Sequence, residues 1–121
     1  MDRRKELKRA FKERPVVAGV FQIRNLITGK IFFGSSVNMH GPLDRNRFLL
    51  TIDKHPNEEL QRDWNTLGPD AFAFETLETI PQHDEPNPDY TEDLAILEQI
   101  WLDRLQPFRE AGYNKEKRIR F

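Results

Sequence analysis

A hairpin signal near the start of the chain constrains its fold more than any other feature. Residues 16–25 form a run rich in β-branched and aromatic side chains, and a similar run returns over residues 30–34. Thr28 and Gly29 lie between the two runs and supply the turn. The sequence therefore predicts an antiparallel pair of strands at the centre of the fold.

The turn also predicts which side chains of the hairpin lie together. A pairing closed at residues 25 and 30 sets Ile23 opposite Phe32 and Phe21 opposite Gly34. Because side chains alternate across a strand, these residues share one face, and Phe21 and Phe32 become diagonal neighbours. Gly34 is expected to leave space above them. The two rings are typical of core packing or of the floor of a shallow cleft.

The remaining periodicity predicts helices packed on a small sheet. A third strand is expected over residues 71–80, so the fold class is α+β, with a three-stranded, mostly antiparallel sheet flanked by helices. The expected helices cover residues 2–13, a segment starting at Gly41-Pro42, a segment capped by Asn57 and ended by Gly68, and a segment from Asp89 or Thr91 to Leu105.

The net charge of −1 hides a segregation of charge along the chain. Residues 1–14 hold seven basic and three acidic residues, and residues 115–121 hold four basic and one acidic residue. We therefore divide the chain into a basic N-terminal helix (1–14), an acidic domain (15–114) and a basic tail (115–121). The basic ends either are solvated, neutralise the acidic domain, or contact an anionic partner.

Composition excludes several classes of protein. The chain has no cysteine, so disulfides and thiolate metal sites are excluded. No apolar run is long enough to span a bilayer, and the charged N-terminus lacks the apolar core of a signal peptide. We expect a cytoplasmic protein without a membrane partner.

The last predicted helix carries an acidic residue, Glu98, on its apolar stripe. A carboxylate among apolar neighbours is costly unless it is paired or binds a metal. Glu98 therefore reaches the rim of the core, pairs with Arg45 or Arg47, or binds a hard divalent cation, which prefers carboxylate oxygen. The stripe consists of Leu94, Leu97, Trp101 and Leu105.

Four short motifs occur in an order that resembles the GIY-YIG nuclease family. The resemblance covers about residues 16–114 and is supported by the intervening segments QIRN, TGK, LQRDWNTLG and FAFETLE. It implies a small α+β nuclease domain of the kind found in homing endonucleases and in an excision-repair incision enzyme. The motifs are Gly19-Val20-Phe21, Phe32-Phe33-Gly34-Ser35-Ser36, Glu98 and Gly112-Tyr113-Asn114.

The resemblance implies hydrolysis of a DNA phosphodiester with one divalent ion, Mg²⁺ or Mn²⁺. The family's metal-binding glutamate corresponds to Glu98 and its bracing asparagine to Asn114. Its two catalytic tyrosines correspond to Phe21 and Phe32, which have no hydroxyl to donate or accept a proton. Its phosphate-holding arginine corresponds to Pro42.

Basic side chains could still hold a phosphate near these positions. Arg45 follows Pro42 by one helical turn, and Arg24 and Arg47 are further candidates for contact with nucleic acid. His40 is a candidate substitute base. We expect Glu98 to face the two phenylalanine rings across one hollow shaped for a phosphate ester.

Three functions are compatible with this pattern. The first is a degenerate nuclease-fold protein that binds nucleic acid and has weak or no hydrolytic activity. The second is an active, divergent, metal-dependent DNA endonuclease that uses Glu98, Asn114 and a substitute base. The third is a structural or protein-interaction module. The oligomeric state is not determined by the sequence.

Overall fold

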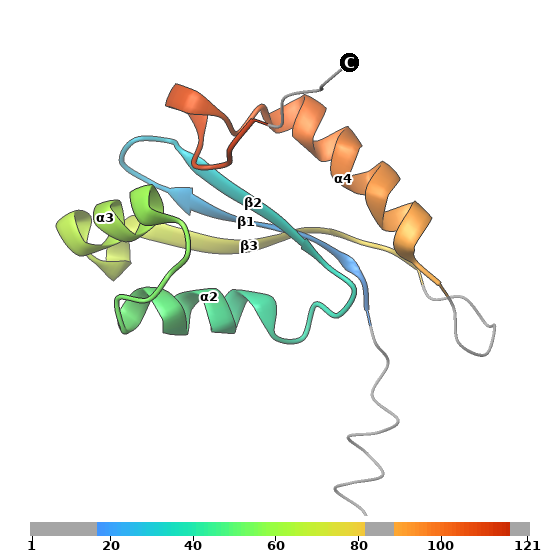
Figure 1. Ribbon diagram of the computed structural model, residues 1–121, viewed down its shortest axis with the longest axis horizontal. Coiled ribbons are helices and arrows are strands. Elements are labelled where there is room, and N and C mark those ends of the chain that lie inside the picture. The colour runs from blue at the N-terminus through green and yellow to red at the C-terminus, as the bar shows by residue number, and fades with distance from the viewer. Residues whose placement is uncertain (1–16, 82–88, 117–121) are drawn as a thin grey trace, which may run out of the picture.

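The computed structural model describes residues 17–81 and 89–116, which form a three-stranded antiparallel sheet with helices on both faces (Figure 1). The strands β1 (Gly19–Asn25), β2 (Ile31–Ser36) and β3 (Phe72–Thr79) lie in the order β2-β1-β3. This confirms the α+β class predicted from the sequence. The predicted N-terminal helix and residues 117–121 of the basic tail lie outside the described residues.

The predicted register of the hairpin is confirmed. Ile23 lies opposite Phe32, and Phe21 lies opposite Gly34. The turn closes where the amide of Asn25 donates to the carbonyl of Lys30 over 2.8 Å. The return strand extends to Ser36, two residues further than the sequence predicts.

Three α-helices in the described ranges follow the sequence signals closely. Pro42 opens α2 (Pro42–Thr51), where the missing N–H of proline costs no helical hydrogen bond. The side chain of Asn57 caps α3 (Glu58–Leu67) by accepting from the amide of Leu60, and Gly68 ends it with a φ of 85°. The long helix is α4 (Thr91–Leu105), and 3₁₀ turns cover Pro69–Ala71 (η1) and Arg109–Ala111 (η2). None of these helices has the length and hydropathy needed to cross a membrane.

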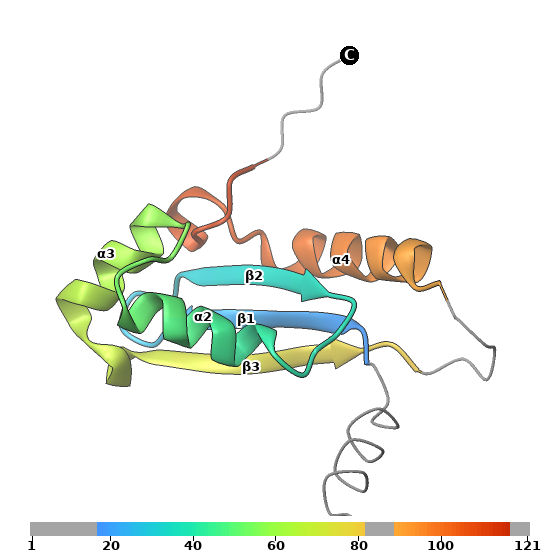
Figure 2. The ribbon, with the colours of Figure 1, turned by 60° about the horizontal axis from the view of Figure 1, so that its bottom comes forward.

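The sheet separates two hydrophobic cores. Figure 2 shows the three strands between α2 and α3 on one face and α4 on the other. Ile23 and Phe72 face α2 and α3, whereas Val20 and Phe33 face α4. This division follows from the alternation of side chains along each strand. One core contains Ile23, Leu50, Leu60, Trp64, Ala71, Phe72 and Tyr113, and the other contains Ala18, Val20, Phe33, Ile80, Tyr90 and Leu94.

The segment after α4 covers the outer edge of β2. The amide of Tyr113 donates to the carbonyl of Ile31 over 2.9 Å, and Gly112 forms a parallel bridge with Ile31. A Cβ on Gly112 would lie 2.1 Å from backbone atoms of Pro107, so only glycine permits this close approach. The C-terminal motif is therefore positioned against the edge strand by a tight backbone contact.

Candidate functional site

Phe21 occupies the space that Gly34 was expected to leave open. A Cβ built on Gly34 would lie 2.4 Å from the Cζ atom of Phe21, so the ring lies directly over the glycine. Phe21 is only 5% exposed. The prediction of free space above Gly34 is therefore wrong, because the ring that faces the glycine across the strand pair fills it.

Phe32 lies half-buried beside His55, which was not among the candidate site residues predicted from the sequence. The ring of His55 meets that of Phe32 edge-on, with 5.3 Å between centroids. His55 is buried, and desolvation lowers its pKa, although the hydrogen bond from Asn57 opposes this shift. The available sequence signal was its position two residues before a helix-capping asparagine. The exposed His40 lies in the turn before α2.

Hydrogen bonds fix the tautomer of His55. Its Nδ1 accepts from the backbone amide of Asn57 over 3.0 Å, so the ring proton lies on Nε2. Nε2 is 2.6 Å from Oδ1 of Asn46, whose amide nitrogen in turn donates to the carbonyl of Pro42. Both ring nitrogens are therefore occupied, and His55 connects α2 with the start of α3 as a neutral imidazole.

The buried side chain of Tyr113 connects β1 and α3 through its hydroxyl. Its hydroxyl donates to Asp63 over 2.6 Å and accepts from Asn25 over 3.0 Å. Burial raises the pKa of Tyr113 well above its usual range, and the hydrogen bond with Asp63 adds to this shift. A tyrosine that holds its proton so tightly is unsuited to act as a general base.

Asn114 binds the backbone of β2 from the edge. Its side-chain nitrogen donates to the carbonyl of Phe33 over 2.8 Å, and its side-chain oxygen accepts from the amide of Phe33 over 2.7 Å. The side chain thus imitates one rung of a β-ladder. This geometry has the form expected of a bracing residue.

Glu98 lies across the sheet from the two phenylalanine positions. It is on α4, which packs on the face carrying Phe33, whereas Phe21 and Phe32 point to the face covered by α2 and α3. Glu98 and the two rings therefore belong to opposite faces of the sheet; among the described hollows, Glu98 lines one and Phe32 another, and the two meet at Asn114 on the β2 edge. The order of motifs in the sequence does not specify which face of the sheet each helix covers.

Glu98 is half-buried and lines a hollow of about 430 Å³ together with Phe33 and Asn114. Within residues 17–81 and 89–116 it has no hydrogen bond or ion pair. The suggested pairing with Arg45 or Arg47 is absent there, because these arginines are on α2. Other charged side chains of this hollow are Asp103, Lys115 and Glu116.

The donor set determines which metal the Glu98 hollow could hold. Among the described residues, no group of three His, Cys, Asp or Glu side chains is arranged to bind an ion. A preformed cage for Ca²⁺ or Zn²⁺ is therefore not found in this part of the chain. Mg²⁺ often keeps several waters and binds through one or two carboxylates plus substrate phosphates, and a single half-buried Glu98 fits that mode.

The three arginines predicted to contact nucleic acid do not form one surface. Nε of Arg24 pairs with Glu75 over 2.9 Å on the α4 side, and this carboxylate raises the pKa of Arg24. Arg47 stacks on Phe74, with 4.2 Å from its Cζ to the ring centroid, and Arg45 is exposed on α2. Arg24 therefore lies on the α4 side of the sheet and Arg45 and Arg47 on α2, and contact of any of them with nucleic acid stays a prediction.

A second hollow lies on the Phe32 side of the β2 edge. Its volume is about 720 Å³, and it shares Asn114 and Lys115 with the Glu98 hollow. Phe32 and Phe33 are neighbours in β2 that point to opposite faces, so the two hollows flank the same strand. The candidate site thus wraps around the β2 edge and is joined at Asn114. The lining residues of the larger hollow, called here the β2-edge hollow, are Phe32, Pro56, Asn57, Glu58, Glu59, Arg62, Arg109, Gly112, Tyr113, Asn114 and Lys115.

Comparison with known proteins agrees with an endonuclease-type domain. The chain is 31% identical over 98 residues to intron-associated endonuclease 1 of enterobacteria phage T4. The aligned stretch covers 80% of this chain and 36% of that protein. The catalytic domain of the homing endonuclease I-TevI superposes with a TM-score of 0.66 at 26% identity, covering 83% of this chain and 99% of that domain. A glutamate-to-alanine mutant of the I-TevI catalytic domain gives a TM-score of 0.63 at 27% identity, covering 81% and 92%.

No family model matches the sequence. The similarity to an endonuclease in both sequence and structure nevertheless covers about four fifths of this chain. The similarity to the I-TevI catalytic domain in both sequence and structure supports a GIY-YIG nuclease domain in this chain. The chain spans about a third of the length of the curated relative, so the similarity concerns that relative's nuclease-like part.

Proposed function

We propose that this domain binds DNA through a nuclease fold while hydrolysing phosphodiesters weakly or not at all. The observation that carries the proposal is Phe21, whose ring is packed over Gly34 without a hydroxyl. The loss of a positioned acid or base reduces a rate by about 10²–10⁴-fold. Phenylalanine keeps the packing of tyrosine and removes that chemistry.

Neighbouring groups do not replace the missing hydroxyls. Among the described residues, the titratable ring stacked edge-on against Phe32 is that of His55, and both of its nitrogens are engaged. Pro42 offers neither a guanidinium nor an N–H at the position of the phosphate-holding arginine. The scaffold of the family is thus kept while three of its reacting positions lack their functional groups.

The metal-binding side of the site keeps the residue types of the family, namely Glu98 and Asn114. Glu98 would hold the ion, and Asn114 would hold β2 in place beside it. When bound, a divalent cation polarises a phosphoryl oxygen and lowers the pKa of its water. This retention favours the second candidate, an active and divergent endonuclease, so the experiment must separate binding from hydrolysis.

The first experiment measures binding. Titration of labelled single- and double-stranded DNA should give an affinity that falls steeply between about 50 and 200 mM salt, since phosphate contacts release counterions. A flat titration against both DNAs at low salt would contradict the proposal. It would favour the third candidate, a protein-interaction module.

The second experiment measures nicking of supercoiled plasmid with Mg²⁺ or Mn²⁺. We expect little nicking by the natural sequence and at least a tenfold gain in the variant with Phe21→Tyr, Phe32→Tyr and Pro42→Arg. Glu98→Ala should abolish that gain, whereas Glu92→Ala, an exposed carboxylate in the first turn of α4, should not. Efficient nicking by the natural sequence that Glu98→Ala abolishes would favour the active endonuclease instead.

A further inference from the structure

Three basic side chains converge on the β2-edge hollow from separate parts of the chain. Arg62 comes from α3, Arg109 from η2 and Lys115 from the segment that follows Asn114. All three residues are exposed. None of them belongs to the ordered motifs, and sequence spacing alone does not bring them together.

Carboxylates in the same hollow only partly compensate this charge. Glu58 and Glu59 also line it, but Glu59 forms an ion pair with Lys30, which adds a further positive charge nearby. Within the lining itself, three basic residues stand against two acidic ones, and outside it Lys30 is matched by Glu116, the partner of Arg109. The Glu98 hollow has the opposite balance, with three carboxylates against one lysine. An anion is thus favoured on one side of the strand and a cation on the other.

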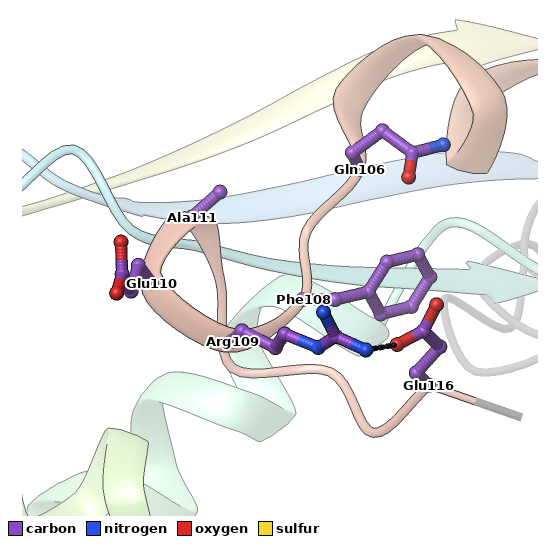
Figure 3. A pocket seen from close by; sticks show the side chains of 6 residues that line it. All are labelled: Gln106, Phe108, Arg109, Glu110, Ala111 and Glu116. Carbon is purple, nitrogen blue, oxygen red and sulfur yellow. Dashed lines mark ion pairs between the residues drawn. The ribbon is translucent and has the colours of Figure 1, made fainter.

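Arg109 is presented by an unusual backbone conformation. Its φ of 56° lies in the left-handed region, which a side chain with a Cβ rarely adopts. Such a conformation persists only where the surrounding contacts impose it. Its guanidinium is 82% exposed and contacts Glu116 over 3.0 Å (Figure 3). The side chain of Arg109 is therefore accessible to a ligand, with Glu116 as a competing partner.

We propose that Arg62, Arg109 and Lys115 hold a nucleic-acid phosphate in the β2-edge hollow, in place of the guanidinium that Pro42 lacks. This inference rests on the proposed function and names the surface that carries out the binding. Guanidinium groups suit the phosphate because they donate two hydrogen bonds in a planar fork. The ring of Phe32 and the side chain of Pro56 supply an apolar wall beside the charges. The volume of about 720 Å³ lies in the range of sites for nucleotide-sized ligands.

The test compares the DNA binding of two variants, each with three basic residues replaced by glutamine. The first variant carries Arg62→Gln, Arg109→Gln and Lys115→Gln. The control carries Arg24→Gln, Arg45→Gln and Arg47→Gln, which removes the same charge from the positions expected from sequence alone. The control also leaves Glu75 without its partner, so it is biased toward a larger loss of DNA binding.

The readout is the slope of log affinity for duplex DNA against log salt. Neutralising a phosphate contact lowers the magnitude of this slope by about one, so the first variant should lose two to three units and at least tenfold in affinity at low salt. The control should lose less than half as much. If the control loses more than the first variant, the inference is wrong while the proposed function stands. Displacement of the DNA by polyglutamate at equal charge concentration would also overturn the assignment to a phosphate.

A substitution of Glu116 tests the inference through an expected gain in affinity for DNA. Glu116→Gln removes the carboxylate that competes for Arg109, so affinity for DNA should rise several-fold. Glu110→Gln makes the same change in net charge from η2, where the carboxylate lies away from the ion pair (Figure 3). Equal effects of the two variants would mean that net charge alone acts and would overturn the role of Arg109.

A small probe separates failure of this inference from failure of the proposed function. If the natural sequence does not bind DNA, the proposed function is wrong, and the hollow is then titrated with inorganic phosphate. Shifts of the Gly112 to Lys115 amide signals that Arg109→Gln removes would still support an anion site. No shift of these signals in NMR spectra would overturn the inference.

Discussion

At the scale of single residues, the polar side chains beside the site are committed to one another. The side-chain oxygen of Asn46 accepts from Nε2 of His55, and the backbone N–H of Asn57 donates to its Nδ1. The side chain of Asn57 also donates to the carbonyl of Tyr113 over 2.8 Å. Each hydrogen bond of this kind contributes about 0.5–1.5 kcal/mol. These residues therefore stabilise the junction of α2, α3 and the C-terminal segment.

The hydrogen bonds of His55 predict a dependence of stability on pH. Its pKa is lowered in the folded protein by burial, so the unfolded chain binds a proton more readily. The contribution is complete above about pH 6.5, the unfolded value, and is lost as the pH falls from there toward the folded pKa. A proton on Nδ1 would also oppose the N–H of Asn57.

Urea denaturation at pH 7.5 and 5.5 checks this prediction, with NMR titration of the His55 ring giving its pKa directly. We expect lower stability at the acid pH and a smaller difference in the variant His55→Gln. His40→Gln, in the exposed turn before α2, is the matched control and should leave the difference unchanged. A His55 pKa at or above 6.5 in the folded protein would contradict the assignment.

At the scale of elements, the candidate site depends on how the segment after α4 packs against β2. Its contact with β2 depends on Gly112, whose φ of −170° is accessible to any residue but whose Cβ position is occupied by Pro107. The requirement for glycine is therefore steric and not torsional. Asn114 follows two residues later and takes its place on the edge of β2 from this contact.

Gly112→Ala tests the dependence of Asn114 on this contact. Because backbone atoms of Pro107 cannot move aside as a side chain would, we expect a loss of about 2–4 kcal/mol in the free energy of unfolding. Faster amide exchange at Phe33, which Asn114 protects, should accompany it. Gly41→Ala has no atom within 4 Å of the new Cβ and serves as control. Unchanged exchange at Phe33 would show that Asn114 is held independently of this contact.

At the scale of the whole molecule, the proposed binding of DNA depends on how charge is distributed over the domain and its ends. The acidic residues of α4 and β3 lie on the face opposite α2 and α3, so a polyanion approaches more easily at the β2 edge. Basic residues at the two ends of the sequence add charge that the domain itself lacks. The domain and its ends thus contribute differently to binding, by local contact and by general attraction.

Deletion of residues 1–14 tests the general contribution. The deletion removes seven basic and three acidic residues, so affinity for DNA at low salt should fall several-fold, and the difference should shrink as salt rises. The melting temperature should stay the same. A lower melting temperature or a changed association state would instead favour the role of a protein-interaction segment.

The sequence by itself determined most of the elements in the described residues and the pairing of the hairpin strands. Alternation, the Thr28-Gly29 turn, Asn57 and Gly68 are local signals, and local signals are sufficient to predict strands, caps and the register of a hairpin. The motif order likewise predicted the family. Tertiary structure alone decided which face each helix covers, and so it separated Glu98 from Phe21 and Phe32. It also brought together His55 with Phe32, and Arg62 with Arg109 and Lys115, because contacts between residues so far apart depend on packing that no local pattern encodes.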